Sequence, residues 1–594
     1  MLSAIKELGE MIIEVEQKTP LEVFVQDPNK SGDYTKVITI NFTLKNSTVN
    51  FTGVEFEEYT EDKIIKYLYR KGSGSGSDYT PTAKLTDKSE GTFSRKILGW
   101  FKILDDKRFR ILQKEDEIFL ESIKQNLEQK SNIIKKEIIK IKNNMSKNDK
   151  MFITLKFNDG DKLYYIGDFN VFKTLLIEQI KVKDSEFAKA DKTCSICGKR
   201  SSFILGNLDV YAFYTLDKPG YITGDFDKSK AWRNFPVCSK CRLALEEGKK
   251  YIESYLDFKF CGIPYNIIPK FIFKENFVRD EVINIFANTE KIVSLRKRVI
   301  DRLTTDENDI FDILKDFKDM MTFDLLFIKR TNSAERILLV IEDVLPSRLR
   351  RIFCAKHSVD EVFSQSFTFG AIRYFFLKSD SDKRDTDLDG YFLGVVDRIF
   401  KDRSISRSFI FSFIMKKIRY EFVKEVQFYF AVINGLQVIY FLSDLNLIKV
   451  EVDSMEQRIF DNMFNKYSQM FKTPLKRGLF LLGSLTEMLL RKQYTERGAK
   501  PFIKNLKSLK MTERDFKGLL PKVQNKLEEY DSFDKGKRQL ASEVANYLLL
   551  AGDDWTVSVD ELNFYFAAGM NLTNEVAKVI YLDKEIPEDV IQKE

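Results

Sequence analysis

Histidine is almost absent from this chain: His357 is the single one among 594 residues. Hydrolases and nucleases that hold a metal through two or more imidazoles, and oxygenases with two histidines and a carboxylate, need more than one. His357 lies in the stretch CAKHSVDEVF, which has no signature of a nucleophile paired with histidine. We predict a structural or surface role for it, and the count disfavours most metal and acid–base catalysis.

A phosphate-binding P-loop is also missing, although residues 71–78 read KGSGSGSD. A P-loop has the pattern GxxxxGK followed by Ser or Thr, so lysine comes directly after its last glycine. Here Gly76 is followed by Ser77 and Asp78. The glycine–serine loop, residues 71–78, therefore needs an explanation other than nucleotide binding.

The chain lacks a long apolar run. The longest stretch without a charged residue, 426–443, contains two glutamines, an asparagine and a glycine, so we predict a buried core element there and not a membrane span. The first 18 residues, MLSAIKELGEMIIEVEQK, form an amphipathic pattern without the features of a signal peptide. We expect a cytoplasmic protein that does not contact membranes.

Length and composition bound the architecture. At roughly 100–200 residues per domain, a chain of 594 residues corresponds to three or four domains. Hydrophobic residues make up 43% of the chain, and its 51 Phe and 24 Tyr argue against widespread disorder. We predict an α+β multidomain protein with a mixed α/β N-terminal region over 1–190, a zinc-binding insert over 191–260, a mixed α/β to helical middle region over 261–450 and an all-α helical bundle over 451–594.

The hydrophobic pattern supports this division. Alternation of apolar and polar residues predicts strands over 35–56, 262–273 and 323–344 and a hairpin over 151–169. Apolar residues at helical spacing predict one long basic helix over 115–148 and a chiefly helical pattern from about residue 345. Over about 455–594 the pattern predicts successive amphipathic helices.

Charge is distributed unevenly near the C-terminus. Residues 456–540 hold 19 Lys and Arg against 10 Asp and Glu, whereas residues 541–594 hold 3 against 11. The basic block is either an ordinary solvated helical surface or a surface that follows a phosphate backbone. We predict a cationic stripe of the kind that carries single-stranded DNA, formed by Lys476, Arg477, Arg491, Lys492, Arg497 and Lys500.

Four of the six cysteines form two Cys-x-x-Cys motifs, Cys194–Cys197 and Cys238–Cys241. Two such pairs supply the four thiolates of a tetrahedral zinc site, and Gly198 suits the tight turn after the first pair. A filled sulfur shell leaves no open position, so we predict one structural zinc per chain. Cys261 and Cys354 lie in apolar strings and are predicted to be buried thiols.

Several stretches together resemble the large subunit of type I-B CRISPR interference complexes (Cascade), in the subgroup with a four-cysteine zinc site. They are MLSAIKELGEMI, YLYRKGSGSGSDYTPTAKLT with TFSRKILGWF, the double Cys-x-x-Cys motif, LLVIEDVLPSRLRRIF, KLEEY and DELNFYFAAGMNL. The resemblance spans residues 1 to about 572 and rests on the order and combination of these stretches.

The resemblance implies a non-catalytic subunit of a complex of guide RNA with backbone and small subunits. Such a subunit checks duplex DNA for a short adjacent motif, helps to open the duplex, holds the displaced strand and recruits a separate helicase-nuclease. Its C-terminal helical portion resembles the small subunit. A shorter product can arise by internal initiation, for which Met455, Met463 and Met470 are the candidates here.

With this resemblance, the glycine–serine loop becomes a candidate DNA contact. Glycine and serine allow a backbone to approach a groove closely, and nearby cations can engage phosphates. We predict reading by shape or through the minor groove, with the contacts made by Arg70, Lys71, Gly72, Ser73, Gly74, Ser75, Gly76, Lys84, Arg95, Lys96 and Lys102. Trp100 is predicted to be a core residue.

Two other functions remain open at the level of sequence. One is an enzyme, either a metal-dependent nuclease or a nucleotide-cyclising subunit, for which NDGD at 158–161 and LDDKRF at 104–109 offer carboxylates. The other is a zinc-containing nucleic-acid-binding regulator unrelated to CRISPR. The first pair of acids fits a hairpin turn and the second has no partner motif, so we favour a protein without catalytic residues.

Overall fold

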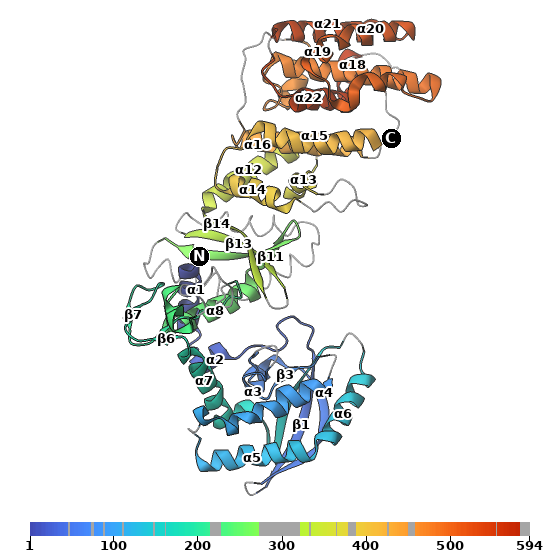
Figure 1. The fold of residues 1–594 in the computed structure, drawn as a ribbon. Coiled ribbons are helices and arrows are strands. Elements are labelled where there is room, and N and C mark those ends of the chain that lie inside the picture. The colour runs from blue at the N-terminus through green and yellow to red at the C-terminus, as the bar shows by residue number, and fades with distance from the viewer. Residues whose placement is uncertain are drawn as a thin grey trace.

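The computed structural model describes residues 1–581 apart from 46–47, 73–75, 87–88, 110–111, 147–148, 161, 214–226, 273–320, 332–333, 364, 378–387, 425–426, 449–457 and 554. Figure 1 shows the parts of the chain stacked along one long axis. An α/β region lies at one end, a second sheet lies in the middle, and a helical bundle forms the other end. The predicted α+β fold class is confirmed.

The N-terminal α/β region is built on a five-stranded sheet. Its strands are β1 (Lys36–Lys45), β2 (Thr48–Glu58), β3 (Ala83–Lys84), β4 (Met151–Asp159) and β5 (Lys162–Tyr165). Their order is β2-β1-β4-β3, with β5 also on β4, and β1 and β4 run parallel while the other pairs are antiparallel. The hairpin of β4 and β5 turns at Gly160, whose φ of +67° suits glycine, and it confirms the predicted hairpin.

Helices α5 (Lys114–Gln129), α6 (Ser131–Asn144) and α7 (Asn170–Ser185) accompany this sheet. The sequence predicted one helix over 115–148, and this was wrong because the backbone leaves the helical conformation at Lys130, whose φ is −96° and ψ is 7°. The break lets α5 and α6 both pack on β2, so that apolar residues of both helices are buried: Leu120, Ile123, Leu127, Ile134 and Ile138.

The first helix of the chain packs away from this sheet, in the middle of the molecule. Helix α1 (Leu2–Val15) lies against α8 (Ser239–Tyr255), which also contacts α2 (Pro20–Phe24). A Cβ atom at Gly9 would lie 1.8 Å from the carbonyl oxygen of Ala244, and one at Gly248 would lie 2.1 Å from that of Ile5. The two glycines therefore allow direct backbone contact between α1 and α8.

The middle sheet is antiparallel, with the order β11-β12-β13-β14. Its strands are β11 (Asp257–Phe260), β12 (Ile263–Phe271), β13 (Met321–Arg330) and β14 (Glu335–Val344). The last three confirm the strands predicted in this part of the sequence, and β11 was not predicted. The rings of Tyr265 and Phe327 stack across β12 and β13 with centroids 5.3 Å apart. Helix α1 contacts β12, so the N-terminal helix completes the core of this sheet.

Helices follow the middle sheet: α12 (Pro346–Phe363), α13 (Phe369–Tyr374), α14 (Asp389–Phe400), α15 (Arg407–Lys424) and α16 (Phe428–Asp444). Residues 431–443 of α16 are all buried, as predicted for the longest uncharged stretch. No described helix combines the length and hydropathy needed to cross a membrane. The prediction of a buried Cys354 was wrong, because its side chain lies on the exposed side of α12, as does His357.

The C-terminal bundle surrounds α18 (Pro474–Arg497), which contacts α20 (Leu519–Glu529), α21 (Lys535–Leu550), α22 (Val559–Asn571) and α23 (Thr573–Ile580). The remaining helices of the bundle are α17 (Asp461–Lys466) and α19 (Glu513–Lys517). A Cβ atom at Gly483 would lie 1.9 Å from the carbonyl oxygen of Phe566, so α18 and α22 touch through their backbones.

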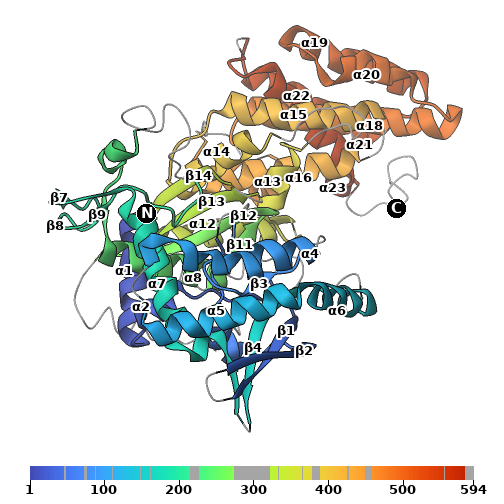
Figure 2. The same cartoon turned by 60° about the horizontal axis from the view of Figure 1, so that its bottom comes forward.

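The core of the bundle continues into the preceding helices. The rings of Phe411 on α15 and Phe564 on α22 lie 5.0 Å apart, and Figure 2 shows α15 running beside α22 and α18. One hydrophobic cluster extends from α1 and the middle sheet through these helices to α22, while the N-terminal sheet has a separate cluster. The bundle is therefore joined to the middle of the molecule by a shared apolar core.

Candidate metal centre and nucleic-acid interface

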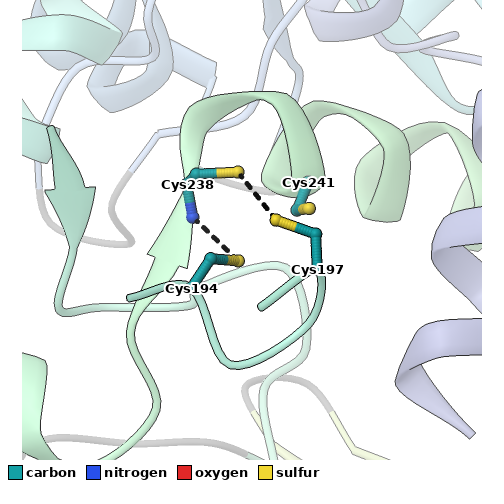
Figure 3. Close-up of side chains that lie close together, drawn as sticks. All are labelled: Cys194, Cys197, Cys238 and Cys241. Carbon is teal, nitrogen blue, oxygen red and sulfur yellow. Dashed lines mark hydrogen bonds between the residues drawn. The ribbon is translucent and has the colours of Figure 1, made fainter. Parts of the chain in front are cut away.

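The cysteines of both Cys-x-x-Cys motifs meet in one cluster (Figure 3). Cys194 and Cys197 lie in the turn between β7 (Lys192–Thr193) and β8 (Arg200–Ser201), Cys238 ends β10 (Val237–Cys238), and Cys241 lies in the first turn of α8. Their four Sγ atoms all lie within 4.8 Å of one another, and those of Cys197 and Cys238 are 4.0 Å apart. Zinc–sulfur bonds of about 2.3 Å in a tetrahedron place sulfurs about 3.8 Å apart, so the cluster fits a tetrahedral ion.

Backbone hydrogen bonds hold the first motif in a tight turn. The amide of Gly198 donates to the carbonyl of Cys194 (3.0 Å), and Gly198 has a φ of +69°, where a side chain would be strained. The amide of Cys238 donates to Sγ of Cys194 (3.4 Å), which links the two motifs (Figure 3). The ligand positions are thus set by the backbone on both sides of the cluster.

The thiols of the cluster have unequal pKa values. Burial opposes ionisation of Cys194, but the amides of Cys197, Cys238 and Ile196 donate to its sulfur and bring its pKa down to about 7. Burial raises the pKa of Cys238 and of Cys241, and in Cys241 the neighbouring cysteines raise it further. A cation at the centre offsets this effect because it attracts thiolates.

The two carboxylates of LDDKRF that were considered for catalysis are engaged in surface interactions, and Asp161 of NDGD lies outside the described residues. Asp106 accepts a hydrogen bond from the Arg108 guanidinium at 2.7 Å, which together with the Arg108 amide lowers the pKa of Asp106. Asp105 lies 3.7 Å from the Lys124 ammonium. In the part of the chain that the structure describes, the four cysteines are the single group of three or more metal-ligating side chains that could hold one ion.

Both ends of the glycine–serine loop are fastened to the protein. The amide of Gly72 donates to Oδ1 of Asp78 (2.8 Å), and the amide of Tyr79 donates to the carbonyl of Arg70 (3.1 Å). A Cβ atom at Gly72 would lie 2.3 Å from the carbonyl oxygen of Ser77, so this position requires glycine. Ser73, Gly74 and Ser75 lie outside the described residues.

Arg70 does not face solvent. Its side chain is buried, and its Nη1 donates to Oε1 of Glu246 on α8 (2.6 Å) and to the carbonyl of Phe24 (2.8 Å). The guanidinium also lies over the Phe24 ring. Arg70 therefore anchors the first stem of the loop to α8, and it is a positioning residue in this structure.

Lys71, Gly72 and Lys84 line a cavity of about 900 Å³ between the loop stem, α2 and α8. The Nζ atom of Lys84 lies 4.3 Å from the centroid of the Tyr34 ring and 5.7 Å from that of Tyr69. Burial lowers the pKa of Lys84, and the structure records no ion pair between it and any described carboxylate. Lys84 is thus a half-buried ammonium group that an incoming anion would stabilise.

The other cations predicted near the loop lie outside the lining of this cavity. Arg95 and Lys96 lie on the π-helical turn η2 (Phe93–Ile97), and Lys102 lies on the 3-10 helix η3 (Leu98–Asp105). Lys96 pairs with Asp78 at the loop stem (3.1 Å), whereas Arg95 and Lys102 are exposed. Trp100 is buried and donates to the carbonyl of Tyr79 (3.0 Å), which confirms its predicted core role.

Helix α8 connects the cysteine cluster to the loop. The residue after Cys241 is Arg242, whose guanidinium binds Asp184 and Asp209 of two segments that precede α8 in the chain. One turn further, Glu246 holds Arg70 at the loop stem, and another turn on, Lys250 donates to the carbonyl of Val25 (2.5 Å) after α2. Burial lowers the pKa of Lys250 to about 8.

Sequence reasoning missed this row of charges on α8. The available signal was the run RLALEEGKK over 242–250, in which charged residues occupy positions that the amphipathic pattern assigns to the buried side. Charged side chains on a buried face need partners of opposite sign or hydrogen-bond acceptors. The partners themselves come from distant segments and could not be identified from spacing.

Two of the six residues predicted for the C-terminal stripe lie inside the bundle. Lys476 is buried 3.7 Å from Glu561, and Arg477 donates to Asp461 (2.7 Å) and to the carbonyl of Phe471 (2.8 Å). Lys476 and Arg477 therefore do not belong to a solvent-facing stripe on the intact chain.

The other four residues of the predicted stripe lie toward the outer end of α18. Arg491 binds Glu487 (3.2 Å) and Asn574 (2.7 Å), and Lys492 pairs with Glu496 (3.1 Å). Arg497 lies exposed over the Tyr530 ring, and Lys500 lies 6.0 Å from the centroid of the Tyr494 ring. Of the six cations predicted for the stripe, the four that remain candidates for a surface contact lie at residues 491–500.

The comparisons with known proteins assign a class to this arrangement. Matches to three domain models of CRISPR-associated proteins together cover most of the chain, which is therefore a CRISPR-associated protein. It belongs to the family of CRISPR-associated protein TM1802, with the N-terminal domain matched over residues 1–178, the central domain over 191–344 and the C-terminal domain over 367–584. The resemblance found in the sequence is thereby confirmed. No curated protein matches the chain.

Proposed function

We propose that this chain is the non-catalytic large subunit of a type I-B complex of guide RNA with backbone and small subunits. In this role it recognises a short motif beside the target in duplex DNA, helps to open the duplex and holds the displaced single strand. It also recruits a helicase-nuclease that acts in trans. Membership in the TM1802 family supports a place among CRISPR-associated proteins, and Lys71 and Lys84 of the loop cavity and the cations at the outer end of α18 support the contacts with DNA.

One observation carries the duplex-reading part of this proposal: Lys84 is half buried in the cavity that Lys71 and Gly72 share, and it forms no salt bridge with a described carboxylate, although Asp27 and Asp33 attract it from a distance. Neighbouring cations of the cavity are paired, as Lys18 is with Glu247 and Lys30 is with Glu253. An ammonium group that has lost part of its hydration gains more from a phosphate than an exposed one does. The backbone of the glycine–serine loop then contacts the DNA groove beside that phosphate.

The test uses the chain assembled with guide RNA and its partner subunits. Target duplexes carry a randomised segment beside the target, and the bound fraction is sequenced to find the preferred motif. Replacing both Lys71 and Lys84 by Ala should remove the preference, whereas replacing the exposed Lys140 and Lys181, which changes the charge equally, should preserve it. An unchanged preference in the Lys71 and Lys84 variant would contradict duplex reading at this cavity.

The cysteine cluster is proposed to hold one structural zinc ion. All four tetrahedral positions come from the protein, so no position is left for substrate or water. The ion would hold the two motifs and the start of α8 together. Elemental analysis of the purified chain should find one zinc per molecule, and a chain that is metal-free and equally stable would contradict the assignment.

A shorter product that begins at an internal methionine would supply free small subunits. Met455 lies outside the described residues, Met463 lies within α17, and Met470 is buried after it. Products that start at Met463 or Met470 lack Asp461, the carboxylate partner of the buried Arg477. Removing one partner of a buried ion pair costs about 3–5 kcal/mol, so Met455 is the start that preserves the bundle. Mass spectrometry of the proteins produced from the gene identifies the residue at which the shorter product begins.

A further inference from the structure

A second cavity, of about 910 Å³, lies between the helices of the middle region and the C-terminal bundle. Its walls are one side of α14, the segment that leads into α15, and the first turn of α22. Figure 2 shows these three helices close to one another, on the side of the molecule that carries the bundle. None of the residues predicted to contact nucleic acid belongs to its lining.

The floor of this cavity is a helix surface without side chains. Gly390 and Gly394 lie one turn apart on α14, and a Cβ atom at either position would meet nothing within 4 Å apart from its chain neighbours and the backbone of its own helix. Neither glycine is therefore required by packing or by an unusual backbone angle, although glycine weakens a helix interior. The two positions leave a flat surface that a planar group from outside the chain could cover.

An aromatic side chain borders that floor. Tyr391 is 54% exposed, and its ring lies 6.1 Å from that of Phe409 and 5.5 Å from that of Phe413 by centroid distance. The two phenylalanines support the tyrosine from one side and keep its orientation. The exposed face of Tyr391 thus remains open for stacking.

The wall beside the far end of this floor, formed by Arg398 of α14 and by the segment that leads into α15, is polar and carries positive charge. The Arg398 guanidinium donates to the carbonyl of Ser404 (2.6 Å), which holds it at the edge of the cavity, and no described carboxylate pairs with it. The hydroxyl groups of Ser406 and Ser408, 2.9 Å apart, lie beside it. Arg407 binds Glu561 of α22, so the wall is tied to the bundle.

We propose that this cavity binds one unpaired nucleotide of a single-stranded nucleic acid. The base stacks on Tyr391 above the glycine floor, and Arg398 with the serine hydroxyls engages a phosphate next to it. Stacking on an aromatic ring combined with cationic contacts to phosphate is the usual means of binding single strands without regard to sequence. This inference rests on the proposed function in one respect, namely that the chain holds a displaced strand.

A nucleotide explains the lining better than a protein segment does. An apolar peptide side chain would need a concave apolar floor, whereas α14 offers an open glycine surface next to a half-exposed ring. A nucleotide combines a flat base with an anionic phosphate. The base fits the glycine floor beside the tyrosine ring, and the phosphate fits the polar wall. A peptide that occupies the cavity is an alternative result of the experiment below.

The test measures binding of a fluorescent oligothymidylate, and of an abasic oligomer of equal length, to the full chain. Gly394→Leu fills the floor with a residue that favours helix, so the fold is preserved while the space is lost. Tyr391→Ala removes the stacking ring, and Tyr391→Phe restores it. Lys140→Gln on α6 controls for loss of one charge, as a match to Arg398→Gln.

Gly394→Leu and Tyr391→Ala should each weaken oligothymidylate binding by about fivefold or more, with Tyr391→Phe close to the wild type. The abasic oligomer should bind the wild type as weakly as it binds these variants. Arg398→Gln should lower the slope of log affinity against log salt by about 0.7, and Lys140→Gln should leave it unchanged.

Undiminished oligothymidylate binding by Gly394→Leu and Tyr391→Ala would overturn the nucleotide pocket while leaving strand binding elsewhere on the chain intact. A wild-type chain that binds no single strand would overturn the strand-holding part of the proposed function as well. If the cavity variants instead prevent assembly with partner subunits and leave oligothymidylate binding unchanged, a protein segment occupies the cavity and the inference fails.

Discussion

The loop cavity and the outer end of α18 hold their cations in different ways. Lys84 lies half buried in the loop cavity beside Lys71 and forms no salt bridge with a described carboxylate. Lys492, Arg497 and Lys500 lie at the outer end of α18, on a helix surface where acids and aromatic rings accompany them. One region is a partly desolvated cavity, and the other is a helix surface on which Arg497 is exposed and Lys492 and Lys500 are partly exposed.

The difference predicts different kinds of DNA contact. A partly desolvated cation interacts strongly with one phosphate at a fixed position, because the effective dielectric constant around it is low. Exposed cations contribute affinity by releasing counterions, and salt weakens that contribution. The loop cavity should therefore provide positional preference, and the outer end of α18 should provide salt-dependent affinity without preference.

The largest expected effect comes from disrupting the cysteine cluster at the start of α8, which we propose holds a zinc ion. Cys241→Ser, or removal of the ion by a chelator, should loosen the start of α8 and with it Glu246 at the loop stem. Structural zinc sites contribute on the order of 10 kcal/mol of binding free energy that is coupled to folding. Limited proteolysis should show new cleavage at both the cysteine motifs and the loop.

Cys354→Ser, at an exposed cysteine outside the cluster, provides the control for this experiment and should leave the cleavage pattern unchanged. Cleavage at the cysteine motifs with a fully protected loop would contradict the link through α8. That result would not contradict the proposed metal site itself.

The second effect concerns the anchor of the loop. Glu246→Gln leaves the buried Arg70 guanidinium without its carboxylate, and removal of one partner of a buried pair costs about 3–5 kcal/mol. Denaturant unfolding should show this loss, and the assembled complex should lose motif preference because the Arg70–Glu246 ion pair no longer holds the loop stem. Adding Arg70→Met to Glu246→Gln should recover much of the stability, because no unpaired charge remains.

If the double variant also recovers motif preference, Arg70 and Glu246 act purely by keeping the fold intact. If stability returns and preference does not, the pair positions the loop for DNA, which is the result that we expect.

A third effect separates binding from stability in the loop cavity. Lys84→Met removes a half-buried ammonium group whose pKa is already lowered by burial, so the midpoint of thermal unfolding should stay equal or rise. Affinity for duplex with the preferred motif should fall about tenfold in the same variant. A fall in unfolding midpoint with unchanged DNA affinity would show that Lys84 is a structural residue.

The smallest effect belongs to the outer end of α18. Replacing Arg497 and Lys500 by Ala should lower the slope of log affinity for single-stranded DNA against log salt by about 1.4, at about 0.7 per lost contact. Preference among duplex motifs should be unaffected. Replacing Lys526 by Ala, which pairs with Glu529 on α20, tests whether any surface lysine of the bundle has the same influence.

Local sequence patterns predicted the cysteine cluster and much of the secondary structure. The spacing of Cys194, Cys197, Cys238 and Cys241 is enough to predict that two pairs of thiols meet in one cluster. The alternation of apolar and polar residues located β4, β5, β13 and β14. Helix α6 was merged with α5 because the apolar spacing passes through Lys130 without a glycine or proline to mark the break. Tertiary packing against β2 decided that boundary, and spacing alone does not contain it.

The partners of the cations could not be predicted. Arg70, Lys476 and Arg477 look in the sequence like the exposed cations beside them, but each pairs with a carboxylate of another element. Glu246 is separated from Arg70 by 176 residues, and Glu561 is contributed by another helix of the bundle. Burial of a charge depends on such long-range pairs, whereas composition reports just the number of charges.

The most direct test of this account measures both regions in one experiment. The assembled complex is prepared as wild type, as the Lys71→Ala and Lys84→Ala double variant, and as the Arg497→Ala and Lys500→Ala double variant. For each, motif preference is measured on randomised duplexes and the salt slope on single-stranded DNA. We predict that the loop variant loses preference and keeps its slope, while the α18 variant loses slope and keeps its preference. If both variants change both quantities to the same extent, the two regions do not have the separate roles described here.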